Sequence, residues 1–134
     1  MSKKENKIKG NYGENIACEY LEKNDFQIIE KNFSCYLGEI DIVAIDKNEL
    51  VFIEVKTRCQ NFFGDPREAV DTNKKNHIYN VAQYYLINKN LSDPYVRFDV
   101  IEIYLYGDQD YKIKHIKNVI TENPFIKRSY YEWN

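Results

Sequence analysis

The sequence predicts a mixed α/β protein in which helices flank one central sheet. Three features support this class: an apolar repeat of helical spacing near the N-terminus, several segments rich in β-forming residues, and a second helical repeat between two of those segments. A chain of 134 residues is long enough to bury roughly two-thirds of its unfolded surface around one core. Because no repeat or Pro/Gly linker divides the chain, we expect residues 1–134 to form a single domain.

The first helix is expected over residues 11–25. Asn11 can serve as its N-cap with Glu14 three residues later, and apolar residues then follow at helical spacing. Residues 1–10, which carry four lysines and one glutamate, are expected to be a mobile basic arm. Residues 121–134 are expected to be a flexible tail.

The elements that follow alternate in a way that implies a mixed sheet. Strands are expected over residues 26–36, 38–46, 49–58, 95–106 and 111–116, and a helix over residues 65–89. The helix start is marked by Asp65 as N-cap, Pro66 at the first helical position and Glu68 at the third. The first three strands can form an antiparallel meander. The helical crossover should make the third and fourth strands parallel.

Four charged side chains interrupt the central hairpin, which is otherwise strongly apolar. Lys47 and Asn48 can form the turn, in which the asparagine is expected to take the positive φ that a tight turn needs. Facing residue numbers then sum to 95, so Asp41 faces Glu54 and Glu39 faces Lys56 on one side of the hairpin. The opposite side is then wholly apolar in its middle, with these residues: Ile40, Ile42, Ala44, Val51, Ile53 and Val55. A slip of one residue would bury Glu54 among aliphatic side chains, so the pattern selects this register.

Two such close carboxylates can bind a hard divalent cation. Mg²⁺ takes one or two carboxylates and completes its octahedron with water and phosphate oxygens, while Lys56 can neutralise one acid or handle a nucleophile. The alternative is an ordinary solvated hairpin end with cross-strand ion pairs. Glu39 is equally well explained as the partner of Lys56 or as a metal ligand. The residues alone leave these alternatives open.

A resemblance to a known family bears on this choice. The resemblance rests on five segments of the sequence: GEIDIVAID, LVFIEVKTR, NYGENIACEYLEKNDF, FGDPREAVDTNKKNHIYNVAQYYL and RFDVIEI. With them the chain resembles the uncharacterised YraN-like family, which is placed in the PD-(D/E)xK, or restriction-endonuclease-like, superfamily and is similar to archaeal Holliday-junction resolvases. The resemblance covers about residues 10 to 120.

The resemblance implies an αβββαβ core and phosphodiester hydrolysis that depends on Mg²⁺ or Mn²⁺. Asp41 then matches the first acid of the motif, Glu54 the second acid and Lys56 the lysine; Ile40 replaces the proline that precedes the first acid. Glu14 occupies the place of the glutamate that resolvase-like members add from their first helix. A capping-box role explains Glu14 equally well. A shared fold does not by itself establish that the protein cuts nucleic acid.

Two further basic residues are candidates for nucleic-acid contacts. Arg58 continues the face of Glu54 and Lys56, and could hold a phosphate beside the metal. Lys74 falls on the inward face of the second helix, where it could contact phosphate or simply extend from the edge of the apolar stripe. His77 is expected to be a core or half-buried histidine, and Asp99 is left outside the site.

The aromatic residues and the cysteines do not by themselves indicate a function. Phe62-Phe63 and the aromatic residues of the tail could stack on unpaired bases, cap the core or fill a contact between two copies of the chain. Three widely spaced cysteines argue against a disulfide framework and against a zinc site. Any metal should therefore be held by oxygen.

Composition limits the class of partner. The formal net charge of −2 and the pI near 5.7 speak against a strongly electrostatic nucleic-acid binder, although both termini are basic. No signal peptide or membrane span is apparent, so a cytoplasmic protein without a membrane partner is expected.

These features support three hypotheses of different classes. The first is a metal-dependent endonuclease acting on DNA, with structured or branched DNA suggested by the similarity to resolvases. The second is a non-catalytic module that keeps the nuclease fold and binds nucleic acid or protein. The third is a structural protein that forms oligomers, and the sequence leaves a homodimer open.

Overall fold

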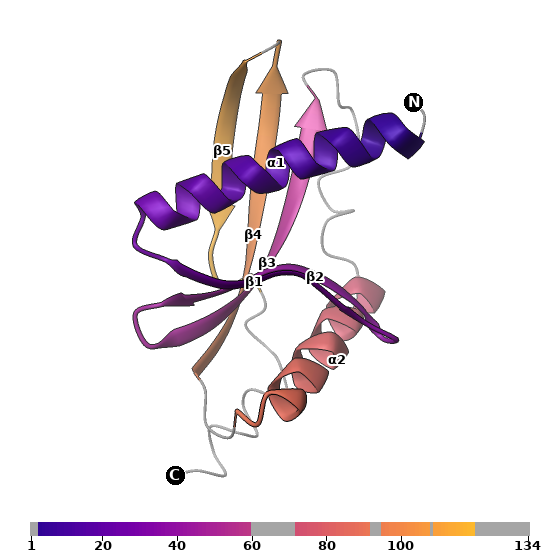
Figure 1. The fold of residues 1–134 in the computed structure, drawn as a ribbon, viewed down its shortest axis with the longest axis vertical. Helices are drawn as coiled ribbons and strands as arrows, with labels where there is room; N and C mark the ends of the chain where they lie inside the picture. Colours follow the sequence, from indigo (N-terminus) through magenta and orange to yellow (C-terminus); the bar gives the residue numbers. More distant parts are fainter. Residues whose placement is uncertain (1–2, 60–71, 92–94, 108, 120–134) are drawn as a thin grey trace.

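The computed structural model describes residues 3–59, 72–91, 95–107 and 109–119; its account of side chains begins at residue 11 in the first range and at residue 77 in the second. The elements are α1 (Lys3–Lys23), β1 (Gln27–Cys35), β2 (Gly38–Asp46), β3 (Glu49–Cys59), α2 (Thr72–Asn88), β4 (Tyr95–Tyr106) and β5 (Asp110–Ile116). This order is the restriction-endonuclease-like αβββαβ core with β5 at its end (Figure 1). The predicted fold class is confirmed.

The five strands form one mixed sheet in the order β1-β2-β3-β4-β5. Neighbouring strands are antiparallel except β3 and β4, which are parallel because α2 lies between them in the chain. Both the meander and the crossover agree with the sequence prediction. The hairpin of β1 and β2 crosses the direction of β3, β4 and β5, so the sheet is strongly twisted (Figure 1).

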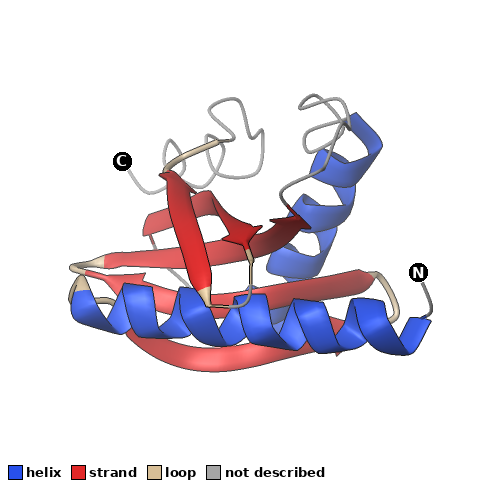
Figure 2. Ribbon diagram, turned by 90° about the horizontal axis from the view of Figure 1, so that it is seen from above, coloured by secondary structure: helices blue, strands red, loops and turns tan. Residues whose placement is uncertain are grey.

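Helices α1 and α2 pack on opposite faces of the sheet (Figure 2). On the α1 face the core contains residues from α1 and from β2, β3 and β4: Ile16, Ala17, Cys18, Leu21, Ile42, Ala44, Val51, Ile53, Ile101 and Ile103. On the α2 face a second cluster joins the helix to the sheet: Phe33, Ile40, Val43, Leu50, Phe52, Val81, Ala82, Tyr85, Leu86 and Phe98. A sheet covered on both faces needs apolar residues at nearly every central position.

Helix α1 begins at Lys3, eight residues before the predicted start. Asn11 therefore lies inside the helix, and its role as N-cap is wrong. The backbone of residues 3–10, expected to be a mobile arm, is helical. Polar residues over this segment obscure the apolar repeat, so the start could not be located from periodicity. Neither helix in the described part of the chain is long and apolar enough to cross a membrane.

Helix α2 is described from Thr72 to Asn88. The predicted start at Asp65, Pro66 and Glu68 lies outside the described residues, as do Phe62-Phe63 and residues 121–134. The end of α2 agrees with the prediction to within one residue. The inward face also agrees, because Val81, Ala82, Tyr85 and Leu86 are all buried against the sheet.

The turn between β2 and β3 has the predicted length but a different conformation. Asp46 pairs with Glu49, which leaves Lys47 and Asn48 as the turn residues. Lys47 has φ of 58°, whereas asparagine was expected to take the positive φ. The predicted register is confirmed over the paired segment, from Asp46–Glu49 to Ile42–Ile53.

A buried polar network ties β4 to the tip of this hairpin. Arg97, only 8% exposed, donates to Asp99 from Nε and Nη2 at 3.0 and 3.1 Å. Its Nη2 also reaches Asp46 at 3.0 Å, and Nη1 reaches Glu49 at 3.1 Å. The guanidinium thus donates charge-assisted hydrogen bonds to three carboxylates. These bonds offset the free-energy cost of burying its charge.

The network continues from Asp99 to β5 and α1. His115 Nε2 donates to Asp99 Oδ2 at 2.8 Å, and the backbone N–H of Asn118 donates to Oδ1 at 2.9 Å. Nδ1 of the same ring lies within hydrogen-bond distance of the Tyr20 hydroxyl, 3.0 Å away. Asp99 therefore links β4 to β5 and α1 on the α1 face of the sheet.

The close approach of α1 to β3 depends on Gly13. A Cβ at this position would lie 1.8 Å from Thr57 Oγ1 and 3.0 Å from Thr57 Cβ. Only a residue without a side chain fits this contact. The next residue along the helix is Glu14, so the contact also sets how near that carboxylate comes to the sheet.

Replacing Gly13 with alanine should destabilise the fold, although alanine is the better helix former. Overpacking costs about 1–3 kcal/mol, while the gain in helix propensity is about 1 kcal/mol. We expect a net loss of about 1 kcal/mol in urea denaturation. In a Thr57→Ala background the same substitution should cost less, because the 1.8 Å contact is gone. An equal cost in both backgrounds would show that this contact does not limit the approach of α1.

Replacing Asp99 with asparagine should cost about 3 kcal/mol at pH 7, because Arg97 and His115 lose acceptors in a buried site. Burial raises the pKa of Asp99, but hydrogen bonds from His115 and Arg97 outweigh it and the net pKa is lowered. This stability is therefore present above the unfolded pKa near 4 and is lost as pH falls through the folded value. Urea denaturation should show the gap between wild type and variant narrowing below about pH 4. Asp110→Asn, at the exposed start of β5, is the control and should change little at any pH.

Candidate active and metal site

The candidate site forms where β2 separates from β3. Their backbone pairing stops at Ile42 and Ile53, one pair short of the predicted Asp41–Glu54 pair. Asp41 Oδ2 instead accepts the backbone N–H of Val55 at 2.8 Å. The side chain thus bridges the space between the diverging strands. The prediction that Asp41 faces Glu54, and Glu39 faces Lys56, across a regular ladder is wrong because β2 turns away with the twisted hairpin.

The divergence coincides with a change of face along β2. Ile42 packs in the α1 cluster, whereas Ile40 packs in the α2 cluster, so two residues predicted on one face lie on opposite faces. The neighbouring strand shows the matching irregularity: Asn32 of β1 has φ of 54° and separates the paired residues Lys31 and Phe33. Asp41 sits at this switch, which re-aims its side chain into the gap.

Helix α1 brings a second carboxylate to the site. Glu14 lies one residue beyond the close contact of Gly13 with β3 and accepts a hydrogen bond from the Asn32 side chain. Burial raises the pKa of Glu14; the Asn32 hydrogen bond lowers it and Glu39 raises it, and the net direction is upward. The structure thus places Glu14 beside the acidic residues of β2, as predicted. The alternative role of Glu14 in a capping box is excluded, because Asn11 lies inside the helix and is not its N-cap.

Asp41 carries the strongest electrostatic load in the site. Its pKa is raised to about 6: burial is the largest cause, the Val55 N–H lowers the pKa, and the negative charges of Glu14, Glu54 and Glu39 raise it further. Four carboxylates from α1, β2 and β3 therefore act on one another. We call Glu14, Glu39, Asp41 and Glu54 the acidic cluster. A bound cation would relieve the repulsion in this cluster and favour the ionised form of Asp41.

Lys56 supplies part of that positive charge. Its Nζ lies 3.8 Å from Glu54 Oε1, and the two side chains are only 15% and 21% exposed. They lie two residues apart on β3 and point to the same face. The motif's second acid and lysine are thus together at the mouth of the gap that Asp41 bridges.

Glu39 is exposed and pairs in the backbone register with Ser34 of β1. It raises the pKa of both Glu14 and Asp41, so it contributes to the repulsion in the cluster. Its exposure makes it an outer member of the site. The hairpin pattern predicts that Glu39 lies opposite Lys56 across the strand pair. In the structure Glu39 instead lies near the other acids of the cluster.

Of the two basic residues predicted to contact nucleic acid, the structure describes the side chain of Arg58 only. Arg58 Nε lies 3.5 Å from Glu102 Oε2, and both side chains are 11% exposed. Tyr104 also donates its hydroxyl to Glu102. Arg58 is thus held by a carboxylate of β4, beyond the acidic cluster along β3. Lys74 lies in α2, but its side chain is outside the described part of the structure.

A cavity of about 270 Å³ opens beside the acidic cluster, between α2 and the sheet. Its rim includes Glu39, Asp41 and Glu54, and its apolar wall includes Phe52 and Phe98. Such a mixture of one apolar wall and a few convergent polar groups is typical of ligand sites.

His77 also lines this cavity. It is exposed, where a half-buried or core histidine was expected. Its Nδ1 donates to the Leu37 carbonyl at 3.2 Å. This contact ties α2 to the turn before β2, so His77 positions the helix end that borders the site.

The donor set determines which metals could bind. All acids of the cluster offer hard oxygen ligands, and Mg²⁺ or Mn²⁺ needs only one or two carboxylates with water or phosphate completing its shell. Within the described residues, no group of three or more His, Cys, Asp or Glu side chains is arranged to ligate one ion. Asp41 and Glu54 as a two-carboxylate set are therefore the arrangement that fits. The raised pKa of Asp41 fits as well, because a bound cation would offset the repulsion.

Sequence reasoning missed two contributors to this site. Asn32 orients Glu14, and the N–H of Val55 holds Asp41. Asn32 had a usable signal, since an asparagine in a polar interruption of a β-rich segment favours positive φ. The role of a backbone N–H depends on where two strands part, and the hairpin pattern contains no signal for that.

Fold and site together define an α/β protein of the restriction-endonuclease-like class with an acidic cluster at the divergence of β2 and β3. Comparison of the sequence with known families then places it more narrowly. The model of "Uncharacterised protein family UPF0102" matches residues 13–103, and the chain belongs to this family. The expected YraN-like relationship is confirmed.

Relatives match over nearly their whole length. A UPF0102 protein of Clostridium botulinum strain 657 is 50% identical over 115 residues, covering 84% of this chain and 94% of that protein. UPF0102 proteins of Caldanaerobacter subterraneus and Clostridium perfringens are 46% and 48% identical, over 88% and 87% of this chain and 98% and 96% of those proteins. Every position of the acidic cluster lies within the residues that the family model matches.

The raised pKa of Asp41 predicts an unusual effect on stability. Its folded pKa is about 6, above the unfolded value near 4, so the group favours the fold when protonated and loses that contribution as pH rises between these values. An asparagine side chain at this position can still accept the Val55 N–H and carries no charge.

Asp41→Asn should therefore be more stable than wild type at pH 7, by about 1–3 kcal/mol, with the difference vanishing near pH 4. Urea denaturation across this range measures it. Glu19→Gln, an exposed change on α1, is the control and should show no such trend. A variant less stable than wild type at pH 7 would contradict the electrostatic account.

Proposed function

We propose that this protein is a metal-dependent nuclease that hydrolyses phosphodiester bonds in DNA. The observation that carries the proposal is the Asp41 carboxylate, held by Val55 in the gap between β2 and β3 with its pKa raised to about 6 beside three other acids. Functional acids are often found where burial and like charges strain ionisation in this way. The nearby pair of Glu54 and Lys56 supplies the remaining groups that phosphodiester hydrolysis needs.

Each residue has a separate role in this proposal. Asp41 and Glu54 would hold Mg²⁺ or Mn²⁺, which supplies positive charge against the phosphoryl oxygens when bound. Lys56, whose Nζ is 3.8 Å from Glu54, would orient a water for attack and, as an ammonium, offset the negative charge that develops on the phosphate. Glu14, fixed by Asn32, supports this water or the cation from the α1 side.

The substrate class is the finer part of the proposal. The similarity to Holliday-junction resolvases favours structured or branched DNA over simple linear duplex. The site opens beside a cavity and at the divergence of the interior strands β2 and β3, which leaves room for a bent strand at the acidic cluster. The proposed location is the cytoplasm.

Purified protein with Mn²⁺ should cleave at least one substrate in a panel of linear, single-stranded and branched DNA. Asp41→Asn should lose at least about 100-fold in rate while folding normally, because it removes a charged ligand of the proposed cation. Lys56→Ala should lose a comparable factor. Lys23→Ala, which removes an exposed lysine of α1, is the matched control and should cleave as wild type does. Equal cleavage by Asp41→Asn and wild type would exclude this site.

A second candidate function follows from the charge of the chain. The formal net charge of −2 and the pI near 5.7 favour a non-catalytic module that keeps the nuclease fold and binds nucleic acid or protein. Titration calorimetry with Mn²⁺ separates the two functions. A catalytic site should bind the ion and lose it in Glu54→Gln, whereas a binding module without metal should show no heat in either protein.

A further inference from the structure

Beyond the acidic cluster, one face of β3, β4 and β5 continues as a basic surface. The strand register places Lys56, Glu102 and Lys114 in one row across the three strands, and Arg58, Tyr104 and Lys112 in the next row. Residues of one row point to the same side of a sheet. We call these six residues, with Tyr106, the β5 face.

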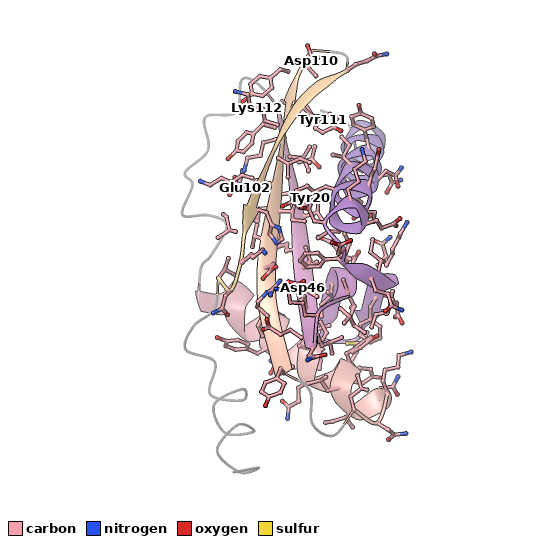
Figure 3. All side chains as sticks on the ribbon, turned by 90° about the vertical axis from the view of Figure 1, so that its left-hand side faces the viewer. Tyr20, Asp46, Glu102, Asp110, Tyr111 and Lys112 are labelled. Carbon is pink, nitrogen blue, oxygen red and sulfur yellow. The ribbon has the colours of Figure 1, made fainter. Side chains whose placement is uncertain are left out.

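The β5 face lies on the side of the sheet away from α1. Figure 3 shows Glu102 and Lys112 on that side, whereas Tyr111 lies on the side of α1, where Tyr20 of that helix also lies. The ion pair of Arg58 with Glu102 and the contact of Lys112 Nζ with the Tyr106 ring, 5.7 Å from its centroid, confirm that these side chains share the face. It therefore continues the surface that carries Glu54 and Lys56.

The charges on this face divide into two groups. Lys56 and Arg58 each lie beside a carboxylate, Glu54 and Glu102 respectively. Lys112 and Lys114 are exposed, and in the described part of the chain no carboxylate forms an ion pair with either. Their charge is thus available to a partner, although the formal net charge of the chain is −2.

The two lysines are also close to the candidate site. Adjacent strands lie about 4.8 Å apart, so two strand spacings put the Cα of Lys114 roughly 10 Å from that of Lys56. A phosphate held at the acidic cluster would therefore have the next phosphates of its strand within reach of Lys114 and Lys112.

Tyr104 and Tyr106 add flat aromatic surfaces beside these charges. Tyr106 is 36% exposed and lies under the Lys112 ammonium. Lysines interleaved with aromatic rings are suited to bind a nucleic-acid strand, because lysines form ion pairs with phosphates and aromatic rings stack on bases. A protein partner would need an acidic patch, but the adjoining acidic cluster would repel it.

We propose that the β5 face binds the DNA strand flanking the bond at the acidic cluster, with Lys112 and Lys114 contacting its phosphates. The inference rests on the proposed function for the identity of the substrate. It adds residues of β5 that the motif does not include. It also gives a direction to the substrate, from the divergence of β2 and β3 along the sheet toward the turn before β5.

Binding can be measured without cleavage in the full-length Asp41→Asn protein, using fluorescence anisotropy with labelled single-stranded, duplex and branched DNA. The Lys112→Glu/Lys114→Glu double variant should lose at least about tenfold in affinity, and the slope of log K against log salt should fall by about 2. The Lys23→Glu/Lys47→Glu variant is the matched control. It makes the same charge change at exposed lysines away from this face and should keep its affinity to within about twofold.

Each outcome has one meaning. Selective loss in the β5 variant supports the inference, and equal loss in both variants overturns it. No affinity of the Asp41→Asn protein for any DNA overturns it too. The nuclease proposal is decided separately, by cleavage in wild type with Mn²⁺. If wild type cleaves and the β5 variant binds normally, only the β5 face is excluded; if the β5 variant loses binding but wild type never cleaves, only the nuclease activity is excluded.

Discussion

The divergence of β2 from β3 is the constraint on which the candidate site depends. Backbone pairing satisfies both strands from the turn to Ile42 and Ile53, and beyond that point the N–H of Val55 would lack a strand partner. The Asp41 carboxylate provides the acceptor. A single hydrogen bond therefore does two things: it ends the ladder without leaving a buried donor unsatisfied, and it fixes an acid in an opening between strands, where a regular sheet would have placed backbone.

Holding the strands apart requires support at both ends of the hairpin. At the turn, Arg97 joins Asp46 and Glu49 to Asp99 of β4, so the hairpin tip is anchored by charge. At the opposite end, α1 packs against β3 through Gly13, and the β5 face continues the sheet beyond the hairpin's last pair. The carboxylates of the network are compensated by a buried cation. Those of the acidic cluster are compensated only in part, and this difference separates structural from candidate functional acids.

Sequence pattern predicted most of the fold because the sheet is covered on both faces. Burial on two sides makes β2, β3 and β4 nearly continuous apolar runs, and the α2 stripe between them implies a parallel crossover. The register followed from keeping Glu54 out of the aliphatic layer. The sequence pattern could not predict that side chains stop alternating between the two faces of the sheet at Asn32 and Ile40. An analysis based on a two-residue repeat assumes an unbroken strand. The start of α1 escaped for a related reason, because its first turns lack an apolar stripe.

The sequence did bring together the acids that matter, but by a different geometry. Asp41 and Glu54 were expected as a facing pair, in which two like charges would be balanced by Lys56 alone. In the structure Asp41 leaves the ladder, and Glu14 and Glu39 approach it, so the negative charge around one carboxyl is larger than the hairpin implied. The chain then places Lys112 and Lys114 on β5, two strands away from these acids.

Lys56 already offsets one acid of the cluster, and further lysines beside it would weaken its affinity for a divalent cation. Lysines roughly 10 Å away, by contrast, can attract a polyanion while leaving the acids to the metal. Under the proposed function, separation of the two charges across the sheet would allow one small acidic protein to bind both a cation and a nucleic-acid strand.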